Sequence, residues 1–418
     1  MKVNRFSRII SFILGLGLVL ACQEQREWVE FRGQHGQGAT PTQIQPPLAL
    51  KWKLKLQEKT EKATSFNPPI IMDDTIYFGS YDGNFYALDL HSGYMRWVFK
   101  TGGHINSIPT ADKENVYFGS DDGKVYAVDR HSGKLKWSYS TGELVQSQIV
   151  CYQDMLVFVT NEGAVYFLDR KGHLLYTLPN YIWSMFTFQI YEDIMFFAPG
   201  GPSSEYGLSA FNVKKQNYLW EMDFNLLTGD WYSYAALVDD LLLMSVAAYH
   251  GDIYLFSFYA LDRQSGKLRW LALDESKLDL YHYRGTAADL FLSYIELLDY
   301  MAPGVWGDLV IYTCGDTIVR AYRVSSGDLA WKKYFDYNTT SAPTIAGGRI
   351  YFGLDGNHLV EKSPGYVAPK LICLAAGDGR HLWETPIEGR ILSAPVIAGR
   401  WIVFGTDEHI FYVMEEVF

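Results

Sequence analysis

The chain is poor in cysteine and in positive charge. It has four cysteines among 418 residues, and 47 acidic residues outnumber 36 basic ones, which gives a formal net charge of −11. Because the thiols are dispersed, the sequence predicts neither a zinc site nor a disulfide framework, although one pair between distant cysteines stays open. The acidic balance argues against binding to nucleic acid or directly to anionic lipid.

Short catalytic motifs are also missing. The sequence has no His-Glu-x-x-His zinc motif, no glycine-rich phosphate loop leading into a helix and no Gly-x-Ser-x-Gly elbow. Two histidines, His91 and His131, occupy equivalent positions of a repeat, which indicates a structural role. We therefore predict no catalytic residue, no metal site and no cofactor.

The most informative feature present is an internal repeat. Residues 76–97 and 116–137 have nearly the same sequence, 40 positions apart. Each copy contains two β-rich runs around an Asp-Gly turn, then a Ser-Gly turn and a closing tryptophan. Such a unit predicts a small antiparallel sheet that must pack against neighbouring copies to bury its faces. The sequence thus predicts an all-β fold, a β-propeller of four-stranded blades.

The tryptophans predict the number of blades. Most copies that end on tryptophan have a glycine four residues earlier, and the blade ends are Trp97, Trp137, Trp220, Trp270, Trp331 and Trp383. The last copy stops without its closing strand, whereas residues 48–56 have the pattern of a lone outer strand. We predict that the strand containing Trp52 completes the last blade and closes a ring of eight blades, with seven as the alternative.

The repeat resembles a known family. The pattern Tyr-Phe-Gly-Ser-x-Asp-Gly-x-x-Tyr-Ala, followed by Asp, Ser-Gly and Trp, is similar to the pyrroloquinoline quinone (PQQ) type propeller repeat. Residues 30–38, Glu-Phe-Arg-Gly-Gln-His-Gly-Gln-Gly, resemble the segment that often precedes this repeat in exported bacterial members. Two branches share the repeat: quinoprotein dehydrogenases, and the non-catalytic BamB lipoproteins of the outer-membrane β-barrel assembly machine.

Three departures separate this chain from the dehydrogenase branch. Those enzymes are generally longer, often have an adjacent cysteine pair, and bind calcium beside a catalytic aspartate. No adjacent cysteine pair occurs here, and aspartates such as Asp89, Asp129 and Asp262 recur with the repeat, so we assign them to turns. The resemblance therefore implies a non-catalytic scaffold whose partners are envelope proteins, such as the barrel assembly machine. The alternatives are a quinone-dependent dehydrogenase and a ligand-binding or sensor propeller.

The N-terminus predicts export and a lipid anchor. A basic start and an apolar run from Ile9 to Ala21 are typical of a signal peptide, here residues 1–21. Residues 19–22, Val-Leu-Ala-Cys, are similar to the lipobox of bacterial lipoproteins, which implies lipidation of Cys22; the alternative is an ordinary signal. Gln23 implies sorting to the outer membrane with the propeller in the periplasm. Residues 22–46 are predicted to be a flexible tether and residues 47–418 the propeller.

One long segment interrupts the repeat, at about residues 286–303. Within it, Phe291, Ile295 and Leu298 fall at helical spacing. One interpretation is a helix folded onto the rim of the propeller. The other is a projection that binds a partner, since loops on rigid scaffolds often carry recognition.

Overall fold

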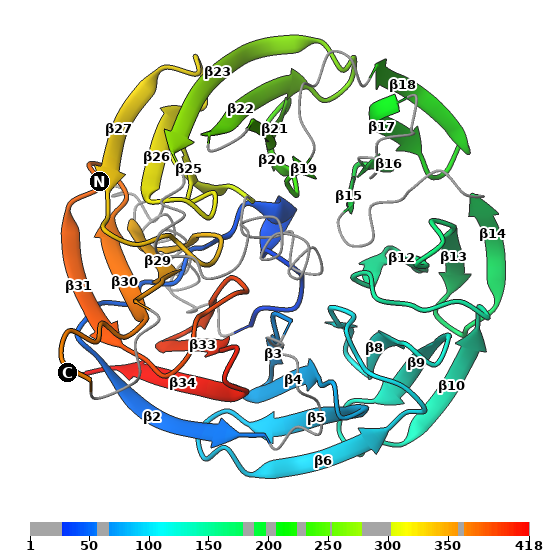
Figure 1. The fold of residues 1–418 in the computed structure, drawn as a ribbon. Coiled ribbons are helices and arrows are strands. Elements are labelled where there is room, and N and C mark those ends of the chain that lie inside the picture. Colours follow the sequence, from blue (N-terminus) through cyan, green and yellow to red (C-terminus); the bar gives the residue numbers. More distant parts are fainter. Residues whose placement is uncertain are drawn as a thin grey trace, which may run out of the picture.

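The chain forms a ring of eight sheets around a central axis, and the sheets follow one another in sequence order (Figure 1). The structure is a computed structural model that describes residues 27–56, 67–178, 188–197, 206–223, 231–250, 253–277, 302–357 and 363–417. It confirms the predicted all-β, eight-bladed propeller. The signal peptide and Cys22 lie outside the described residues, as do Phe291, Ile295 and Leu298.

The first four blades are regular four-stranded antiparallel sheets. From the innermost strand outwards they are β3 (Ile70–Met72), β4 (Thr75–Gly79), β5 (Asn84–Asp89) and β6 (Met95–Lys100); β7 (Thr110–Ala111), β8 (Asn115–Ser120), β9 (Lys124–Asp129) and β10 (Leu135–Ser140); β11 (Val150–Tyr152), β12 (Met155–Val159), β13 (Val165–Asp169) and β14 (Leu174–Leu178); and β15 (Phe188–Tyr191), β16 (Ile194–Phe197), β17 (Tyr206–Asn212) and β18 (Asn217–Asp223).

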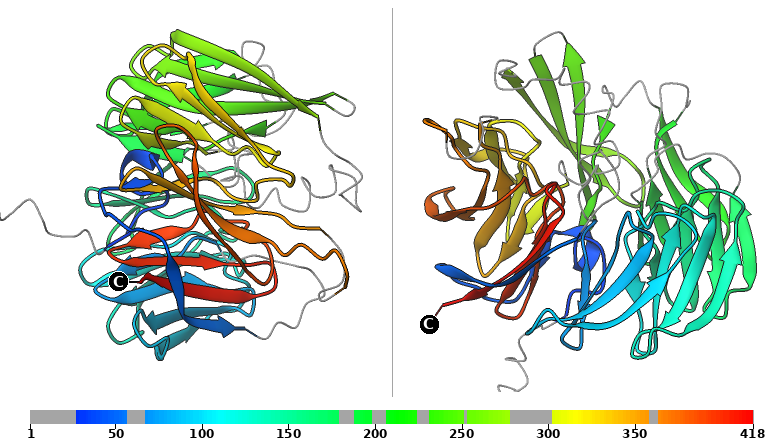
Figure 2. Two further views of the ribbon diagram at one scale, coloured as in Figure 1. Left: turned by 90° about the vertical axis from the view of Figure 1, so that its left-hand side faces the viewer. Right: turned by 60° about the horizontal axis from the view of Figure 1, so that its bottom comes forward.

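The last four blades include two variations. Blade five has β19 (Trp231–Tyr232) and β20 (Ala236–Val238), both paired with β21 (Leu241–His250), then β22 (Ile253–Asp262) and β23 (Leu268–Lys277). Blade six has β24 (Gly304–Trp306), β25 (Leu309–Tyr312), β26 (Ile318–Arg323) and β27 (Leu329–Tyr334). Blade seven has β28 (Thr344–Ala346), β29 (Arg349–Leu354), β30 (Lys370–Ala375) and β31 (His381–Pro386), with β1 (Ala39–Thr40) added in parallel to β28. The long β21–β22 hairpin rises beyond the ring on one face (Figure 2).

The N-terminal strand closes the ring as predicted. Blade eight consists of β32 (Val396–Ala398), β33 (Trp401–Gly405), β34 (Ile410–Glu416) and β2 (Leu48–Lys55). Strands β2 and β34 are antiparallel, from the pair Leu48 and Glu416 to the pair Lys55 and Ile410. Strands from both ends of the chain therefore share one sheet. Strand β2 gives the last blade its fourth strand and covers the edge of β34.

Burial decreases from the axis to the rim. Every residue of the inner strands β4 and β33 is buried, because each of these strands lies between two neighbouring blades. The outer strand β10 instead alternates exposed and half-buried residues. This gradient explains the sequence pattern, in which continuous β-branched and aromatic runs alternate with mixed polar runs.

Seven of the eight blades are fastened to the next by an aromatic residue near the outer end, in contacts that the described residues show. The Trp97 indole donates a hydrogen bond from Nε1 to the Arg130 carbonyl of the next blade, at 2.8 Å. The same ring lies against Gly133, where a Cβ atom would be 2.8 Å from Cδ2 of Trp97. The same indole–glycine contact joins Trp52 to Gly93, Trp137 to Gly172, Trp220 to Gly266, Trp270 to Gly327 and Trp331 to Gly379. In blade three Tyr176 takes this place, and its hydroxyl donates to the Val213 carbonyl at 2.7 Å.

The recurrent aspartates hold the turns that present these glycines. Oδ1 of Asp89 accepts hydrogen bonds from the backbone N–H groups of His91 and Ser92, and Oδ1 of Asp129 does the same in the next blade. Asp262 repeats the arrangement, and its hydrogen bond to the Arg269 side chain lowers its pKa to about 2. These carboxylates therefore stabilise turns, as the sequence predicted.

One expectation about the N-terminus is wrong. Residues 27–46 of the predicted flexible tether pack into the ring: Trp28 pairs with Ile71 of β3, and β1 pairs with β28. Phe31, Arg32 and Ile44 are buried. A Gln-, Gly- and Thr-rich composition suggested flexibility, but these residues are fixed by tertiary contacts that composition does not encode. None of the described helices is long and apolar enough to cross a membrane.

The indole–glycine contact predicts a difference between two glycines. Gly133 and Gly142 both have positive φ, +69° and +80°, but only at Gly133 would a Cβ atom meet a neighbour, the Trp97 ring. Both Gly133→Ala and Gly142→Ala should carry the left-handed backbone penalty of about 1–2 kcal/mol. Gly133→Ala should lose a further ~1–3 kcal/mol through overpacking. Chemical denaturation of both variants measures the difference, and equal losses would contradict this role of the indole.

Candidate functional site

The N-terminal segment enters the central channel and is anchored there by Arg32. This side chain is 1% exposed, and its Nη2 donates to the carbonyls of Pro303 and Pro343, at 2.7 and 2.9 Å. The Gly38 N–H bonds back to the Arg32 carbonyl, and the Ile345 N–H bonds to the Gly38 carbonyl. A hydrogen-bonded charge thus holds the segment against blades six and seven.

Phe31 fills the axis beside this anchor. It belongs to a buried cluster with Ile108, Tyr234 and three alanines, Ala302, Ala342 and Ala394, which come from different blades. Gly36 passes so close to blades four and five that a Cβ atom would lie 1.5 Å from Nε2 of Gln189. The glycines of residues 30–38 are therefore needed for the segment to fit the channel.

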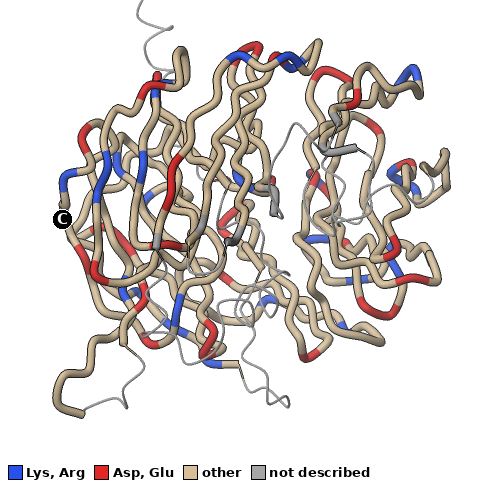
Figure 3. The backbone as a smooth tube through the Cα atoms, turned by 45° about the horizontal axis from the view of Figure 1, so that its top comes forward, with Lys and Arg blue, Asp and Glu red and all other residues tan. Residues whose placement is uncertain are grey.

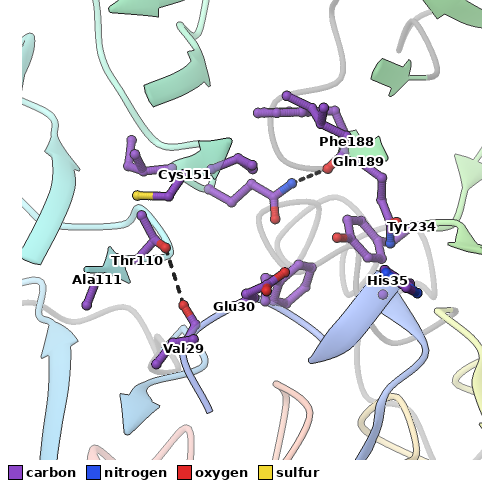
Figure 4. A pocket seen from close by; sticks show the side chains of 15 residues that line it. Val29, Glu30, His35, Thr110, Ala111, Cys151, Phe188, Gln189 and Tyr234 are labelled. Carbon is purple, nitrogen blue, oxygen red and sulfur yellow. Dashed lines mark hydrogen bonds between the residues drawn. The ribbon is translucent and has the colours of Figure 1, made fainter. Parts of the chain in front are cut away.

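A cavity of about 250 Å³ remains between this segment and the inner strands of blades two to five. It is lined by Val29, Glu30, Phe31, His35, Gly36, Thr110, Ala111, Gln148, Ile149, Val150, Cys151, Phe188, Gln189, Ile190 and Tyr234. Figure 4 shows Cys151 and Thr110 on one side of Glu30, and Tyr234 and His35 on the other. Thr110 also donates a hydrogen bond to the Val29 carbonyl at 3.3 Å, which ties the segment to blade two.

Burial sets the protonation of the groups around this cavity. It raises the pKa of Glu30, and it raises the pKa of the Cys151 thiol to about 12, so this cysteine is a neutral thiol at physiological pH. Burial also raises the pKa of Tyr234. His35 has a lowered pKa because burial and the nearby Arg263 disfavour its cation, an effect that Glu192 partly offsets. The cavity therefore contains one acidic group among neutral ones.

The cavity does not suit a PQQ-type cofactor. Such a quinone is a tricarboxylate, which needs basic side chains or a metal ion, and the described lining residues include no lysine or arginine. Its one acidic side chain, Glu30, would repel the cofactor. Within the described ranges, no group of three or more His, Cys, Asp or Glu side chains is arranged to hold a metal ion.

Comparison with known families gives the relationship that the repeat implied. A family model described as outer membrane protein assembly factor BamB matches residues 49–180 and 315–416, more than half of the chain. The chain belongs to this family. The matched ranges include the closing strand β2, the regular blades one to three, and blades seven and eight, whereas residues 181–314 lie outside the match. No curated protein matches the chain.

Solved structures share the propeller across both branches of the PQQ-like fold. BamB from Moraxella catarrhalis is 14% identical, with a TM-score of 0.62 over 88% of this chain and 99% of that one. A quinohemoprotein alcohol dehydrogenase from Pseudomonas putida HK5 is 15% identical, with a TM-score of 0.69 over 96% of this chain and 82% of that one. A europium-containing methanol dehydrogenase is 12% identical, with a TM-score of 0.63 over 96% and 100%. At these identities the likeness shows the fold alone.

The residues singled out from the sequence are not those that line the cavity. Trp52 has a structural position, and its Nε1 donates to the Leu90 carbonyl at 2.9 Å. Cys22 and the proposed partner-binding residues lie outside the described ranges. Sequence reasoning missed Arg32 and Glu30, although the motif at residues 30–38 contains both. It also missed Gln148 and Tyr234, whose signal is a departure from the repeat.

The Arg32 anchor gives a second prediction. Arg32→Ala removes two hydrogen bonds that a charged side chain donates, and it leaves the buried carbonyls of Pro303 and Pro343 without this donor. The free energy of unfolding should therefore fall by roughly 2 kcal/mol or more. Hydrogen exchange at the amides of Gly38 and Ile345 should accelerate, because both lie beside the anchor. Arg380→Ala, at a side chain that is 70% exposed, is the control and should change neither quantity. Unaltered exchange at Gly38 would show that Arg32 does not hold the segment.

Proposed function

We propose that this protein is a non-catalytic scaffold of the bacterial cell envelope, anchored to the outer membrane through Cys22 with its propeller in the periplasm. The observation that carries the proposal is the occupied channel. Phe31 and Arg32 fill the axis of a propeller whose family is that of an outer-membrane assembly factor. A PQQ-type quinone bound in this channel would need room and positive charge, and the channel offers a small cavity with an unsuitable donor set.

The surface is consistent with contacts to other proteins. Acidic and basic residues are interspersed around the described part of the ring and gather at turns (Figure 3). Apolar side chains stand out on the outer strand of blade five, where Leu268 is 53% and Leu273 is 71% exposed. Leu271, two residues from Leu273 on the same face of β23, is 42% exposed, and adjoining exposed apolar side chains of this kind mark protein-binding surfaces where they form a patch. Membership of the BamB family supports outer-membrane protein assembly as the process in which such contacts are used.

A quinone-dependent dehydrogenase is the second candidate, because enzymes of that class share the propeller. Incubation with PQQ and calcium, followed by assays with alcohols and sugars, separates the two. The scaffold proposal requires no turnover. Stoichiometric, saturable PQQ binding accompanied by turnover would overturn it.

The lipid anchor can be tested directly. Acylation requires the Cys22 thiol, so Cys22→Ala should lose a radiolabelled fatty acid and leave the membrane fraction, or remain unprocessed. Cys151→Ala is the matched control and should keep the label, because this half-buried cysteine is not at the cleavage site. Wild-type protein that is cleaved before residue 22 but carries no lipid would contradict the assignment.

Partner binding can be tested with the segment that interrupts the repeat. Replacing residues 287–301, which include Phe291, Ile295 and Leu298, with a Gly/Ser linker should leave the far-ultraviolet circular dichroism of the propeller unchanged. A pull-down from native membranes in mild detergent, read by mass spectrometry, should then lose one specific envelope protein that the wild type retains. Unchanged co-purification combined with a large loss of stability would assign this segment to folding.

A further inference from the structure

The central cavity lies where two blades differ from three others at one position near the axis. The second residue before the inner strand is alanine in blades six, seven and eight: Ala302, Ala342 and Ala394. At the same position blade three has Gln148 and blade five has Tyr234, while blade four places Gln189 within its inner strand, β15. Blades one and two have the apolar residues Pro68 and Ile108 there, so the fold does not require a polar side chain at this position. The larger polar side chains therefore need another explanation, and all of them line the cavity.

The wall made by these side chains is fixed by hydrogen bonds. Nε2 of Gln189 donates to the Ala235 carbonyl at 2.6 Å, and Nε2 of Gln148 donates to the Phe188 carbonyl. Both amides also reach the hydroxyl of Tyr234. Each amide that donates through nitrogen keeps its oxygen as an acceptor. The wall is thus rigid and rich in acceptors before any ligand arrives, which lowers the entropic cost of binding.

Glu30 supplies a charge that this wall does not neutralise. Its side chain is solvent-accessible where it faces the cavity, while the protein atoms around the carboxyl partly desolvate it and raise its pKa. Within the described residues its carboxylate has no hydrogen-bond or ion-pair partner. The rings of Phe31 and Tyr234 lie beside it in an edge-to-face pair, with centroids 4.9 Å apart. Carboxylates and aromatic rings both attract cations.

We propose that this cavity binds a small organic cation, an ammonium or guanidinium group that meets the Glu30 carboxylate while a short carbon stem lies against Phe31 and Tyr234. A volume of about 250 Å³ is below that of pockets for drug-sized molecules, so the ligand is short. The same chemistry could come from a free amine or from a lysine or arginine side chain of a peptide. This site goes beyond the scaffold role and is independent of it.

The charged groups around Glu30 set how binding depends on pH. Cys151 faces it from β11, Tyr234 from blade five, and His35 and Arg32 from its own segment. Arg170 and Asp112 lie beyond Cys151 and form an ion pair with each other at 2.8 Å. The thiol and phenol stay neutral and Arg32 stays charged across the neutral and mildly acidic range. Protonation of Glu30 removes the negative charge, and protonation of His35, whose pKa is lowered, adds positive charge at more acidic pH. Both changes oppose a cation, so affinity should fall as pH is lowered through the raised pKa of Glu30.

The test is isothermal titration calorimetry on the full mature chain in detergent micelles. The ligands are n-butylguanidinium and n-butylammonium, with n-butanol as the neutral comparison and butyrate as the anionic one. Both cations should bind saturably at one site per chain with a millimolar or tighter Kd, and the comparison compounds should give no saturable heat. Acetyl-Gly-Arg-Gly amide distinguishes the sources: binding as tight as n-butylguanidinium indicates a peptide side chain, and binding of the free cation alone indicates a small molecule. Both results support the site.

Two measurements keep the proposal open to refutation. Glu30→Gln is nearly isosteric and should weaken cation binding at least about tenfold and remove the part of the pH dependence that comes from Glu30, because the charge is lost. Glu162→Gln, in an exposed turn of blade three, is the matched control and should bind as the wild type does. If Glu30→Gln does not fold by circular dichroism, the pH series on the wild type decides. No cation binding at about 10 mM, equal binding of butyrate, or affinity that ignores both Glu30→Gln and pH would overturn the proposal.

Discussion

The ring depends on one contact that recurs between successive blades, the indole of one blade lying on a glycine of the next. Trp97 shows both parts of it: the ring covers Gly133, and its N–H bonds to the Arg130 carbonyl. The apolar ring is buried and the indole N–H is hydrogen-bonded in the same contact. The hydrogen bond therefore fixes the position of the ring as well as allowing its burial. The glycine must have positive φ and no Cβ atom, which explains why tryptophan and glycine recur at a constant spacing. Propeller closure needs the same contact at the seam, and Trp52 supplies it from the other end of the chain.

The N-terminal region has two structural roles that its composition does not reveal. Strand β2 completes the last blade, and the residues before it cross the channel, where Arg32 bonds to the carbonyls of blades six and seven. The blades that accept this segment have alanine at the axis, whereas the blades on the opposite side have larger polar residues. A near-symmetric ring therefore becomes asymmetric at its centre, and that asymmetry creates the cavity around Glu30.

The repeat in the sequence predicted the fold almost completely, because local patterns determine each blade. The Asp-Gly and Ser-Gly turns, the aspartates and the tryptophans act within one blade or between neighbours, and so their spacing is visible along the chain. The path of residues 27–46 could not be predicted in this way, since Arg32 contacts carbonyls 271 and 311 positions away. The cavity residues have a weaker signal in the sequence. Aligning the blades at the second residue before each inner strand contrasts Gln148 and Tyr234 with three alanines, and this comparison could have found them.

The most direct test of this account is the stability of the seam. Trp52→Ala removes the indole that fastens the last blade to the first, and Leu50→Ala changes a 50% exposed side chain in the same strand. Guanidinium denaturation should show a loss of about 3–5 kcal/mol for Trp52→Ala, as for other truncations of large aromatic side chains, because the half-buried indole packs on Gly93 and bonds to the Leu90 carbonyl. The loss for Leu50→Ala should stay below about 1 kcal/mol. Equal and small losses for the two variants would show that the ring does not depend on the indole contact at its seam.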